Sequence, residues 1–299
     1  MKYIDKSIHR KEFDVYTRQY LNDARTKDSD FIPKLASKSS YDGFSNKKYK
    51  TTAIPQGSQY NGWLGLLLQE QECRCCYCMR ELTADEVSVE HLLPESFEGL
   101  DETEEYEFYC DKASSIRDNV MTGNEFDKLV SEGQIVVDSL VKMPHLIAHS
   151  NLFPACKTQC DGCSCNSNRG NKRILPLMLM EDVDSWMYYD ENGELFLTYK
   201  ETKIAKDTIL HLDINTPTQK EIRHLWYLFS KKQIEPDIAR DASFSVKEHL
   251  LTTAFDTDKI YSLPSTYIKY FTEDNYWKLF LQHNWFYTYY LNKYPPQQP

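Results

Sequence analysis

The sequence predicts a mainly helical α+β fold whose core is a small, zinc-stapled unit of strands and a helix. The first observation is that two tight cysteine clusters lie far apart in the chain: Cys73, Cys75, Cys76 and Cys78, and then Cys156, Cys160, Cys163 and Cys165. The second is the alternation of apolar and polar residues at 87–90, which predicts a half-buried strand between the clusters. The third is the helical spacing of apolar residues after about residue 200.

The composition is that of an ordinary globular protein, with 41% hydrophobic and 27% charged residues in a chain of 299. The first residues, MKYIDKSIHRKEF, lack the apolar region of a secretory signal. No apolar run approaches the roughly 18 residues that a membrane span needs. We therefore expect a cytoplasmic protein that does not cross a membrane.

The cysteines are expected to bind metal. Disulfides are rare in a reducing compartment, and two tight clusters far apart in sequence are typical of a zinc site built from two knuckles. Two alternatives remain. The clusters can carry redox chemistry at a CxxC motif, or their thiols can be buried as small hydrophobic groups.

Three regions are expected along the chain. Residues 1–60 comprise an N-terminal helix and a basic loop, LASKSSYDGFSNKKYK. Residues 61–180 form the core, which begins with a short buried helix at 63–68 and contains a long insertion at about 98–150. The helix of the first region is indicated by Phe13, Tyr16, Tyr20 and Leu21. The insertion is expected to be helical around residues 126–140.

The third region, residues 181–299, is expected to be mostly helical and to offer a partner-binding surface. Thr216 is a predicted N-cap, Pro217 fits the first helical position and Gln219 completes a capping box. Apolar residues then recur at helical spacing: Ile222, Leu225, Trp226 and Phe229. The tail is dense in aromatic residues, including Trp277, Phe280, Trp285, Phe286, Tyr289 and Tyr290. These aromatic residues form either a core or a face for a partner.

Four short segments carry the residue types that phosphodiester hydrolysis needs: CCYC at 75–78, SVEHLLP at 88–94, NLFPAC at 151–156 and CNSNRGNK at 165–172. Such hydrolysis requires an activated water and positive charge near the phosphate. An ordinary histidine is partly unprotonated at neutral pH, so we expect His91 to be the general base. Glu90 and Asn168 offer the oxygen ligands that Mg²⁺ or Mn²⁺ prefers.

The remaining polar residues have expected supporting roles. Glu90 and His91 are neighbours on a strand, so they can serve one site only if the strand becomes irregular before Pro94. Asn151 is expected to hold the imidazole of His91 or the loop that carries it. The basic residues Lys157, Arg169, Lys172 and Arg173 are candidates for phosphate binding. His145 and His149 either line the site or pack in a loop.

In order and spacing, these segments resemble the HNH (ββα-metal) endonuclease superfamily, over about a third of the chain. The resemblance implies a treble-clef-like ββα core with helical elaborations at both ends. It implies that structural zinc is bound by Cys75, Cys78, Cys156 and Cys165. It also implies that His91 is the general base, that Asn151 orients it, and that Glu90 and Asn168 bind the catalytic metal.

This chain departs from the family pattern at three points. The second cysteine cluster is not a simple CxxC, so Cys160 or Cys163 can replace an assigned ligand or bind a second zinc. In the first cluster, Cys73 and Cys76 form an overlapping CxxC. Glu90 stands where aspartate is commoner, and its longer side chain changes the reach to a metal.

Within the superfamily, the chain resembles the nuclease subunit of Septu-type (PtuB-like) and retron-associated anti-phage defence systems. The shared features are the Trp63 helix, the insertion before Asn151 and the helical tail from near Leu212. That family works with an ABC-type ATPase, so the resemblance implies such a partner. A partner would offset the net charge of −10, which opposes nonspecific binding to nucleic acid even though residues 1–50 hold twelve basic and seven acidic residues.

DNA is the expected substrate. Because the motif contacts phosphate rather than bases, an RNA-cleaving toxin with the same site remains an alternative. The other alternative is a non-catalytic, zinc-stapled adaptor whose aromatic tail binds a partner.

Overall fold

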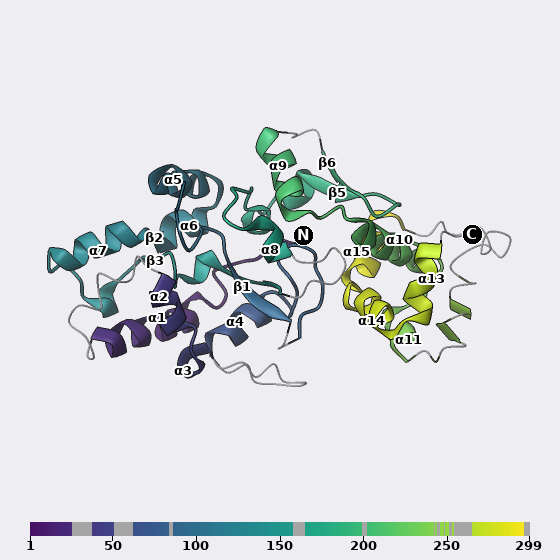
Figure 1. Ribbon diagram of the computed structural model, residues 1–299, viewed down its shortest axis with the longest axis horizontal. Helices are drawn as coiled ribbons and strands as arrows, with labels where there is room; N and C mark the ends of the chain where they lie inside the picture. Colours follow the sequence, from purple (N-terminus) through teal and green to yellow (C-terminus); the bar gives the residue numbers. More distant parts are fainter. Residues whose placement is uncertain are drawn as a thin grey trace.

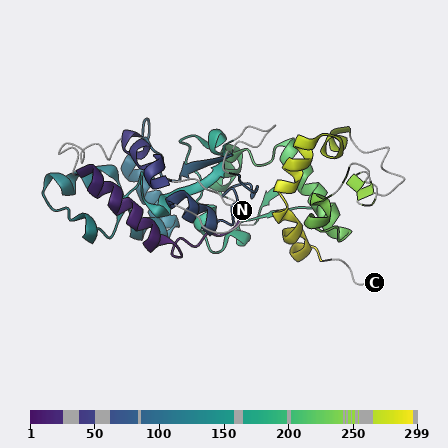
Figure 2. The ribbon, with the colours of Figure 1, turned by 90° about the horizontal axis from the view of Figure 1, so that it is seen from below.

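The computed structural model is a mainly helical α+β fold. It describes residues 1–25, 38–50, 62–83, 86–157, 165–198, 202–241, 243, 246–247, 249–250, 253 and 265–295. Figures 1 and 2 show an elongated molecule with one group of helices at each end and the longest strands between them. Across these described ranges, the strands form three separate two-stranded sheets.

The central element is a two-stranded antiparallel sheet of β1 (Val87–His91) and β4 (Leu152–Cys156), called the central sheet below. Its register pairs Val87 with Cys156 and His91 with Leu152, so the whole of β1 is a regular strand. The predicted strand is therefore confirmed and extends to His91. Helix α8 (Cys165–Arg169) follows β4 in the chain and packs against it, which completes a β–β–α unit.

The N-terminal region packs on this unit through aromatic side chains. Helix α1 (Arg10–Arg25) contacts α4 (Trp63–Glu70), and both helices were predicted. Phe13 and Trp63 are fully buried, and burial was predicted for the Trp63 helix. The loop predicted for LASKSSYDGFSNKKYK is wrong for residues 38–50. These residues form the short helices α2 (Lys38–Phe44) and α3 (Lys47–Lys50). Phe44 stacks on Trp63 at 5.0 Å, so tertiary packing overrides the loop-like composition.

The insertion is more broken than expected. Its elements are α5 (Glu102–Lys112), α6 (Ser114–Asn119), β2 (Val120–Met121), α7 (Gly123–Ser131), η2 (Val137–Ser139), β3 (Met143–Pro144) and η3 (His149–Asn151). Helix α7 ends early because Gly133 adopts a φ of 65°. The Gln134 N–H then donates to the Leu129 carbonyl and the Gly133 N–H to that of Val130, which is a Schellman C-cap.

The C-terminal region is mostly helical, as predicted. Short turns η4 (Leu177–Leu179) and η5 (Val183–Ser185) precede the hairpin of β5 (Met187–Tyr189) and β6 (Leu195–Leu197). The helices are α9 (Lys203–Leu212), α10 (Pro217–Lys231), α11 (Pro236–Arg240), α13 (Ser265–Thr272), α14 (Asp274–Gln282) and α15 (Trp285–Lys293). Thr216 caps α10 by accepting from the Gln219 N–H, as predicted.

The tail aromatics mainly form a core. Trp226 of α10 stacks on Phe280 of α14 at 4.2 Å, and its indole N–H donates to the Phe280 carbonyl. Phe286 and Tyr290 of α15 are also buried, whereas Trp285 and Tyr289 are half-buried. No helix in the described part of the chain has the length and apolar character needed to cross a membrane.

Candidate functional site

Four cysteine side chains converge at one end of the central sheet. Cys75 and Cys78 lie in the loop between α4 and β1, Cys156 ends β4, and Cys165 begins α8. All four are buried, and their sulfur atoms lie within 4.8 Å of one another. The Sγ atoms of Cys75 and Cys156 are 3.8 Å apart, and those of Cys78 and Cys156 are 4.0 Å apart.

This cluster is consistent with a zinc site. Tetrahedral zinc with Zn–S distances of about 2.3 Å places its ligand sulfurs about 3.8 Å apart, close to the separations found. The backbone supports it, since the Cys156 N–H donates to Cys75 Sγ, as it would to a thiolate. The predicted set of four is therefore brought together, whereas Cys160 and Cys163 lie outside the described residues.

The chemistry of the four thiols also favours a bound cation. The pKa of the Cys165 thiol is raised well above its usual value, first by hydrogen bonding with Cys156 and then with Cys75 and Cys78, and further by burial. Four buried thiols cannot all ionise without positive charge among them. Zinc supplies that charge and would join the loop before β1, the end of β4 and the start of α8.

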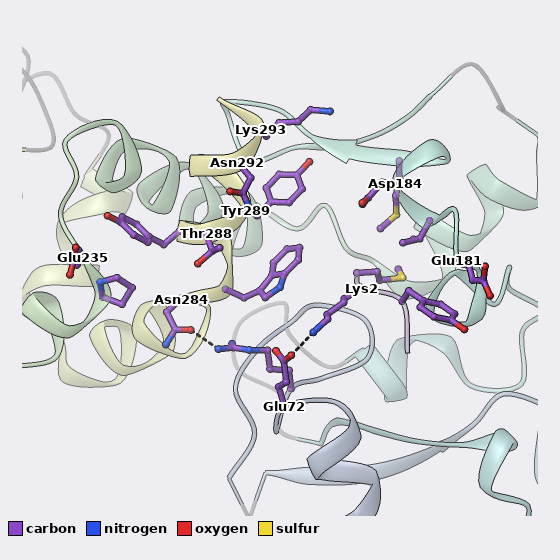
Figure 3. A pocket seen from close by; sticks show the side chains of 18 of the residues that line it. Lys2, Glu72, Glu181, Asp184, Glu235, Asn284, Thr288, Tyr289, Asn292 and Lys293 are labelled. Carbon is purple, nitrogen blue, oxygen red and sulfur yellow. Dashed lines mark hydrogen bonds and ion pairs between the residues drawn. The ribbon is translucent and has the colours of Figure 1, made fainter. Parts of the chain in front are cut away.

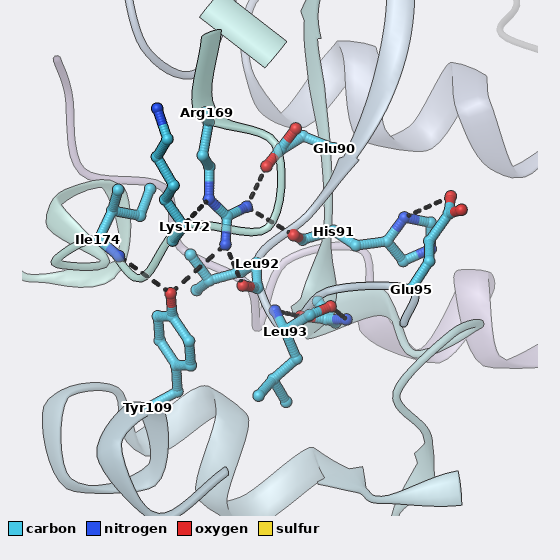
Figure 4. Close-up of polar contacts among 10 residues, drawn as sticks. Glu90, His91, Leu92, Leu93, Glu95, Tyr109, Arg169, Lys172 and Ile174 are labelled. Carbon is cyan, nitrogen blue, oxygen red and sulfur yellow. Dashed lines mark hydrogen bonds and ion pairs between the residues drawn. The ribbon is translucent and has the colours of Figure 1, made fainter. Parts of the chain in front are cut away.

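His91 lies at the end of β1 in a nearly closed environment. Its Nε2 is 3.0 Å from the carbonyl oxygen of Leu146, and its Nδ1 is 3.2 Å from Oε1 of Glu95. The Tyr41 ring of α2 lies edge-on to the imidazole at 4.5 Å, and only 3% of the His91 side chain is exposed. Because a carbonyl can only accept, Nε2 carries a proton and Nδ1 is the nitrogen turned to the carboxylate (Figure 4).

Glu90 lies on the opposite face of the central sheet from His91, contrary to the prediction that the two residues share a site. The strand remains regular through both residues, so their side chains alternate. The Glu90 carboxylate turns to the guanidinium of Arg169, whereas the His91 imidazole turns to Glu95 (Figure 4). Burial raises the pKa of Glu90, and the charge of Arg169 opposes that rise.

Arg169 was predicted to bind phosphate, but its side chain is not available for that role. Its side chain is buried and donates to the Glu90 carboxylate, to the hydroxyl of Tyr109 and to the backbone carbonyls of His91, Leu92 and Lys172. These contacts involve all three guanidinium nitrogens. The other predicted phosphate-binding residues are nearer to solvent.

Of these, Lys157 and Lys172 are exposed. Arg173 is half-buried and pairs with Glu105 at 2.7 Å. Asn168 is half-buried on α8, next to Arg169. Within the described ranges, no hydrogen bond joins Asn168 to His91, so these two predicted catalytic residues are not shown in contact.

Asn151 joins the two loops around His91. Its Oδ1 accepts from the Leu93 N–H at 2.6 Å, and its Nδ2 donates to the carbonyls of Leu93 and His145. The amide thus makes the backbone contacts expected from the sequence. It fixes the segment after His91 against the loop that presents the Leu146 carbonyl.

Sequence reasoning missed Glu95 and Tyr41 and treated His145 as an open case. Glu95 follows Pro94 in a loop, where no periodicity predicts the direction of a side chain, and Tyr41 lies in a segment expected to be a loop. His145 is buried, and Phe97 packs against its ring at 5.3 Å. Burial first, and then the charge of His91, lowers the pKa of His145 to about 3.

A separate hollow of about 1,050 Å³ lies between the N-terminal residues, the loop before β1 and helix α15 (Figure 3). Its lining includes the exposed acidic residues Glu181, Asp184, Glu235 and Asp237. His91 is not part of its lining. The same lining also holds the basic residues Lys2, Arg74 and Lys293, so the hollow carries charges of both signs.

Comparisons with protein-family models, with curated proteins and with solved structures found no match for this chain.

Proposed function

We propose that this protein is a metal-dependent endonuclease of the HNH (ββα-metal) type, acting on DNA. The observation that carries the proposal is the setting of His91. It ends the first strand of a β–β–α unit, its Nε2 is fixed by a backbone carbonyl, and Asn151 joins the loops on both sides of it. The four-cysteine cluster holds the same unit together.

In this proposal, Nδ1 of His91 accepts the proton of the attacking water. The carbonyl of Leu146 fixes the tautomer, because it leaves only Nδ1 with a lone pair in the neutral ring. Lys157 and Lys172, which are exposed, would provide positive charge for the phosphate. A divalent cation, Mg²⁺ or Mn²⁺, would supply charge at the scissile phosphate. Asn168 remains a proposed ligand of it, whereas Glu90 can bind it only if Arg169 moves away.

The isolated chain is proposed to be latent. His91 is covered by Tyr41 of α2, so a phosphodiester can reach it only after this helix moves. The net charge of −10 also opposes binding to nucleic acid. We propose that an ABC-type ATPase partner relieves both effects, as in anti-phage defence complexes.

Plasmid cleavage with added Mg²⁺ or Mn²⁺ tests the proposal, with and without proteins encoded beside it. We expect His91→Ala to abolish cleavage and to retain zinc, whereas His9→Ala, at a partly exposed histidine, should cut at the wild-type rate. Cleavage by His91→Ala at the wild-type rate would refute the mechanism. Single-stranded RNA in parallel reactions distinguishes the RNA-cleaving toxin.

A non-catalytic adaptor is the second candidate. One observation favours it: the pairing of Glu90 with Arg169 occupies the carboxylate that the family resemblance assigns to the catalytic metal. The adaptor predicts partner binding that survives His91→Ala and no metal-dependent cleavage by the assembled complex. Loss of cleavage in His91→Ala would exclude it.

A further inference from the structure

Three titratable side chains that the proposed reaction does not use form a buried cluster beside β4, called the buried triad below. They are Lys6, Glu70 at the end of α4 and His149 at the start of η3. Nζ of Lys6 lies 2.7 Å from Oε2 of Glu70, and Nε2 of His149 lies 3.3 Å from Oε1 of the same carboxylate. No more than 1% of any of these side chains is exposed. The carboxylate therefore joins the N-terminal segment to η3 inside the protein.

The buried triad carries charge although it is closed to water. Burial raises the pKa of the Glu70 carboxyl, but the charge of Lys6 and the contact with His149 outweigh it, so this pKa lies below its usual value. Glu70 is thus ionised and paired with Lys6. A buried ion pair adds little net stability, because apolar side chains of similar volume often stabilise a protein as well or better. An ion pair differs from apolar packing mainly in direction, since its atoms meet at defined distances and angles.

The chain at 145–152 carries the groups that hold His91 and the loop after it. The Leu146 carbonyl faces Nε2 of His91 at 3.0 Å, and the Asn151 side chain binds both backbone groups of Leu93. The direction of the imidazole therefore depends on where this segment lies.

The buried triad contacts this segment at two points. Nζ of Lys6 donates to the Leu152 carbonyl at 2.9 Å, and Leu152 is the residue that pairs with His91 in the central sheet. His149 begins the short turn η3, and Asn151 ends it. The triad thus fixes both the strand residue opposite His91 and the turn that carries Asn151.

We propose that Lys6, Glu70 and His149 are positioning residues that hold the imidazole of His91 in one tautomer and one direction. They do not touch the ring, and they act through residues 145–152 and the Leu146 carbonyl. The inference rests on the proposed function in one respect, since His91 is a general base only in that reaction. A base must keep its lone pair aimed at the attacking water, so its supporting residues need directional contacts of their own.

The test is nitrogen NMR of the isotope-labelled histidine rings in the zinc-loaded full chain, at pH of about 8, above the ordinary pKa of histidine. A ring held in one tautomer gives two widely separated nitrogen signals, whereas exchange between tautomers brings them together. The His91 signals are identified by their loss in His91→Ala. We expect wide separation in the wild type and a clear loss of separation in His149→Leu, which removes the contact with Glu70.

Three further variants separate positioning from stability. His149→Gln keeps a donor for the Glu70 carboxylate and should restore the wild-type separation. Lys6→Met combined with Glu70→Leu removes both charges together, so it should stay folded and lose the separation as His149→Leu does. Leu225→Ala, at a buried position of α10, lowers stability elsewhere and should leave the His91 signals unchanged. Zinc content and circular dichroism verify that each variant is folded.

Four results would overturn the inference: averaged His91 signals in the wild type, wild-type separation in folded His149→Leu, an equal change in Leu225→Ala, or unfolding of both His149→Leu and the double variant. The last would mean that the triad holds the fold and not the direction of one ring. Because the signals are recorded without a nucleic acid, they separate this inference from the nuclease. Where the protein cuts DNA, His149→Leu should lower the cleavage rate about tenfold or more, a part of the about 10²–10⁴-fold that a positioned base supplies. Loss of separation in a protein that cuts no substrate would support the positioning and refute the proposed function.

Discussion

The guanidinium group of Arg169 lies inside the protein against the carboxylate of Glu90 and the backbone carbonyl of His91. This contact joins α8 to β1, so one side chain connects the helix of the β–β–α unit to its first strand. The same contact removes both Arg169 and Glu90 from the residues available to substrate and metal. Its main effect is on stability.

Replacing Arg169 with Met should destabilise the protein by about 3–5 kcal/mol, because it leaves the buried Glu90 carboxylate unpaired. Burial already raises the pKa of Glu90, and loss of the arginine would raise it further. The folded state would then bind a proton that the unfolded state releases above pH of about 4.3, so the stability deficit grows as pH rises. Thermal unfolding at pH 5 and pH 7.5 measures it.

The double variant Glu90→Gln with Arg169→Met is the control, since it removes the charge as well as its partner. The double variant should regain part of the stability lost in Arg169→Met. It should also lose most of the pH dependence of that deficit, because Gln does not titrate. An Arg169→Met deficit that is equal at the two pH values would contradict the assignment.

The cysteine cluster predicts one structural zinc per chain. Cys78→Ser and Cys165→Ser should each abolish stoichiometric zinc and unfold the core, because a structural zinc contributes about 10–16 kcal/mol of apparent binding free energy. Elemental analysis of the purified protein and its thermal unfolding measure both effects. A chelator should destabilise the wild type in the same way.

Matched controls are available within the chain. Cys76 is buried next to the cluster but is not among its four members, and Cys110 is half-buried in the insertion. Cys76→Ala and Cys110→Ala should keep the zinc. Loss of zinc in Cys76→Ala with retention in Cys78→Ser would show that the overlapping CxxC supplies the ligands instead.

The covering of His91 by Tyr41 leads to a prediction for activity. If α2 must move to admit substrate, Tyr41→Ala should favour the open form, because an aromatic pair contributes about 0.5–1.5 kcal/mol. Cleavage by the chain with its partner absent should then rise about two- to tenfold. Tyr41→Phe keeps the ring and should behave as the wild type does. Reduced cleavage in Tyr41→Ala would show that the ring assists the reaction rather than blocks it.

The sequence predicts local features well and side-chain direction poorly. The capped start of α10, the buried Trp63 helix and the strand at Val87 depend on short-range periodicity and capping, and all three are present. The set of four cysteines was predictable from the family resemblance, whereas the spacing alone left other cysteines of both clusters as alternatives. The direction of the Glu90 side chain was not predictable from the sequence, because it depends on whether β1 stays regular as far as His91. The pairing of His91 with Leu152 decides this, and no local pattern reveals it.

The helices α2 and α3 show a second limit. Their serine, lysine and glycine content predicts a loop, but Phe44 and Tyr49 are buried against α1 and α4. Burial of two aromatic side chains outweighs weak helix propensity, and no local pattern reveals the surface on which they pack. The contact of Tyr41 with His91 was invisible for the same reason.

Two glycines with the same backbone conformation should respond differently to alanine. Gly193 and Gly99 both have a φ of 76°. A Cβ on Gly193 would lie 2.2 Å from the carbonyl oxygen of Lys220 in α10, whereas one on Gly99 would meet nothing within 4 Å. Gly99→Ala should therefore lower the free energy of unfolding by only about 1–2 kcal/mol, the cost of placing alanine in a left-handed conformation. Gly193→Ala should lower it by clearly more. Equal losses in thermal stability would contradict the close approach of this turn to α10.

Acidification should destabilise the fold through buried histidines. Burial is the main cause that lowers the pKa of His283 to about 3, although its hydrogen bond to the Leu279 carbonyl opposes the shift. Below pH of about 6.5, the unfolded histidine binds a proton that the folded one does not, so the free energy of unfolding falls as pH falls. Between pH 6.5 and pH 5 this one residue should remove up to about 2 kcal/mol.

His283→Asn isolates this contribution, because asparagine can still donate to the Leu279 carbonyl but does not titrate. The variant should show a shallower loss of stability between pH 6.5 and pH 5 than the wild type, measured by urea unfolding at each pH. Zinc release at low pH affects both proteins alike, so the difference between their slopes reports His283. Identical slopes for wild type and His283→Asn would mean that His283 is protonated in the folded protein.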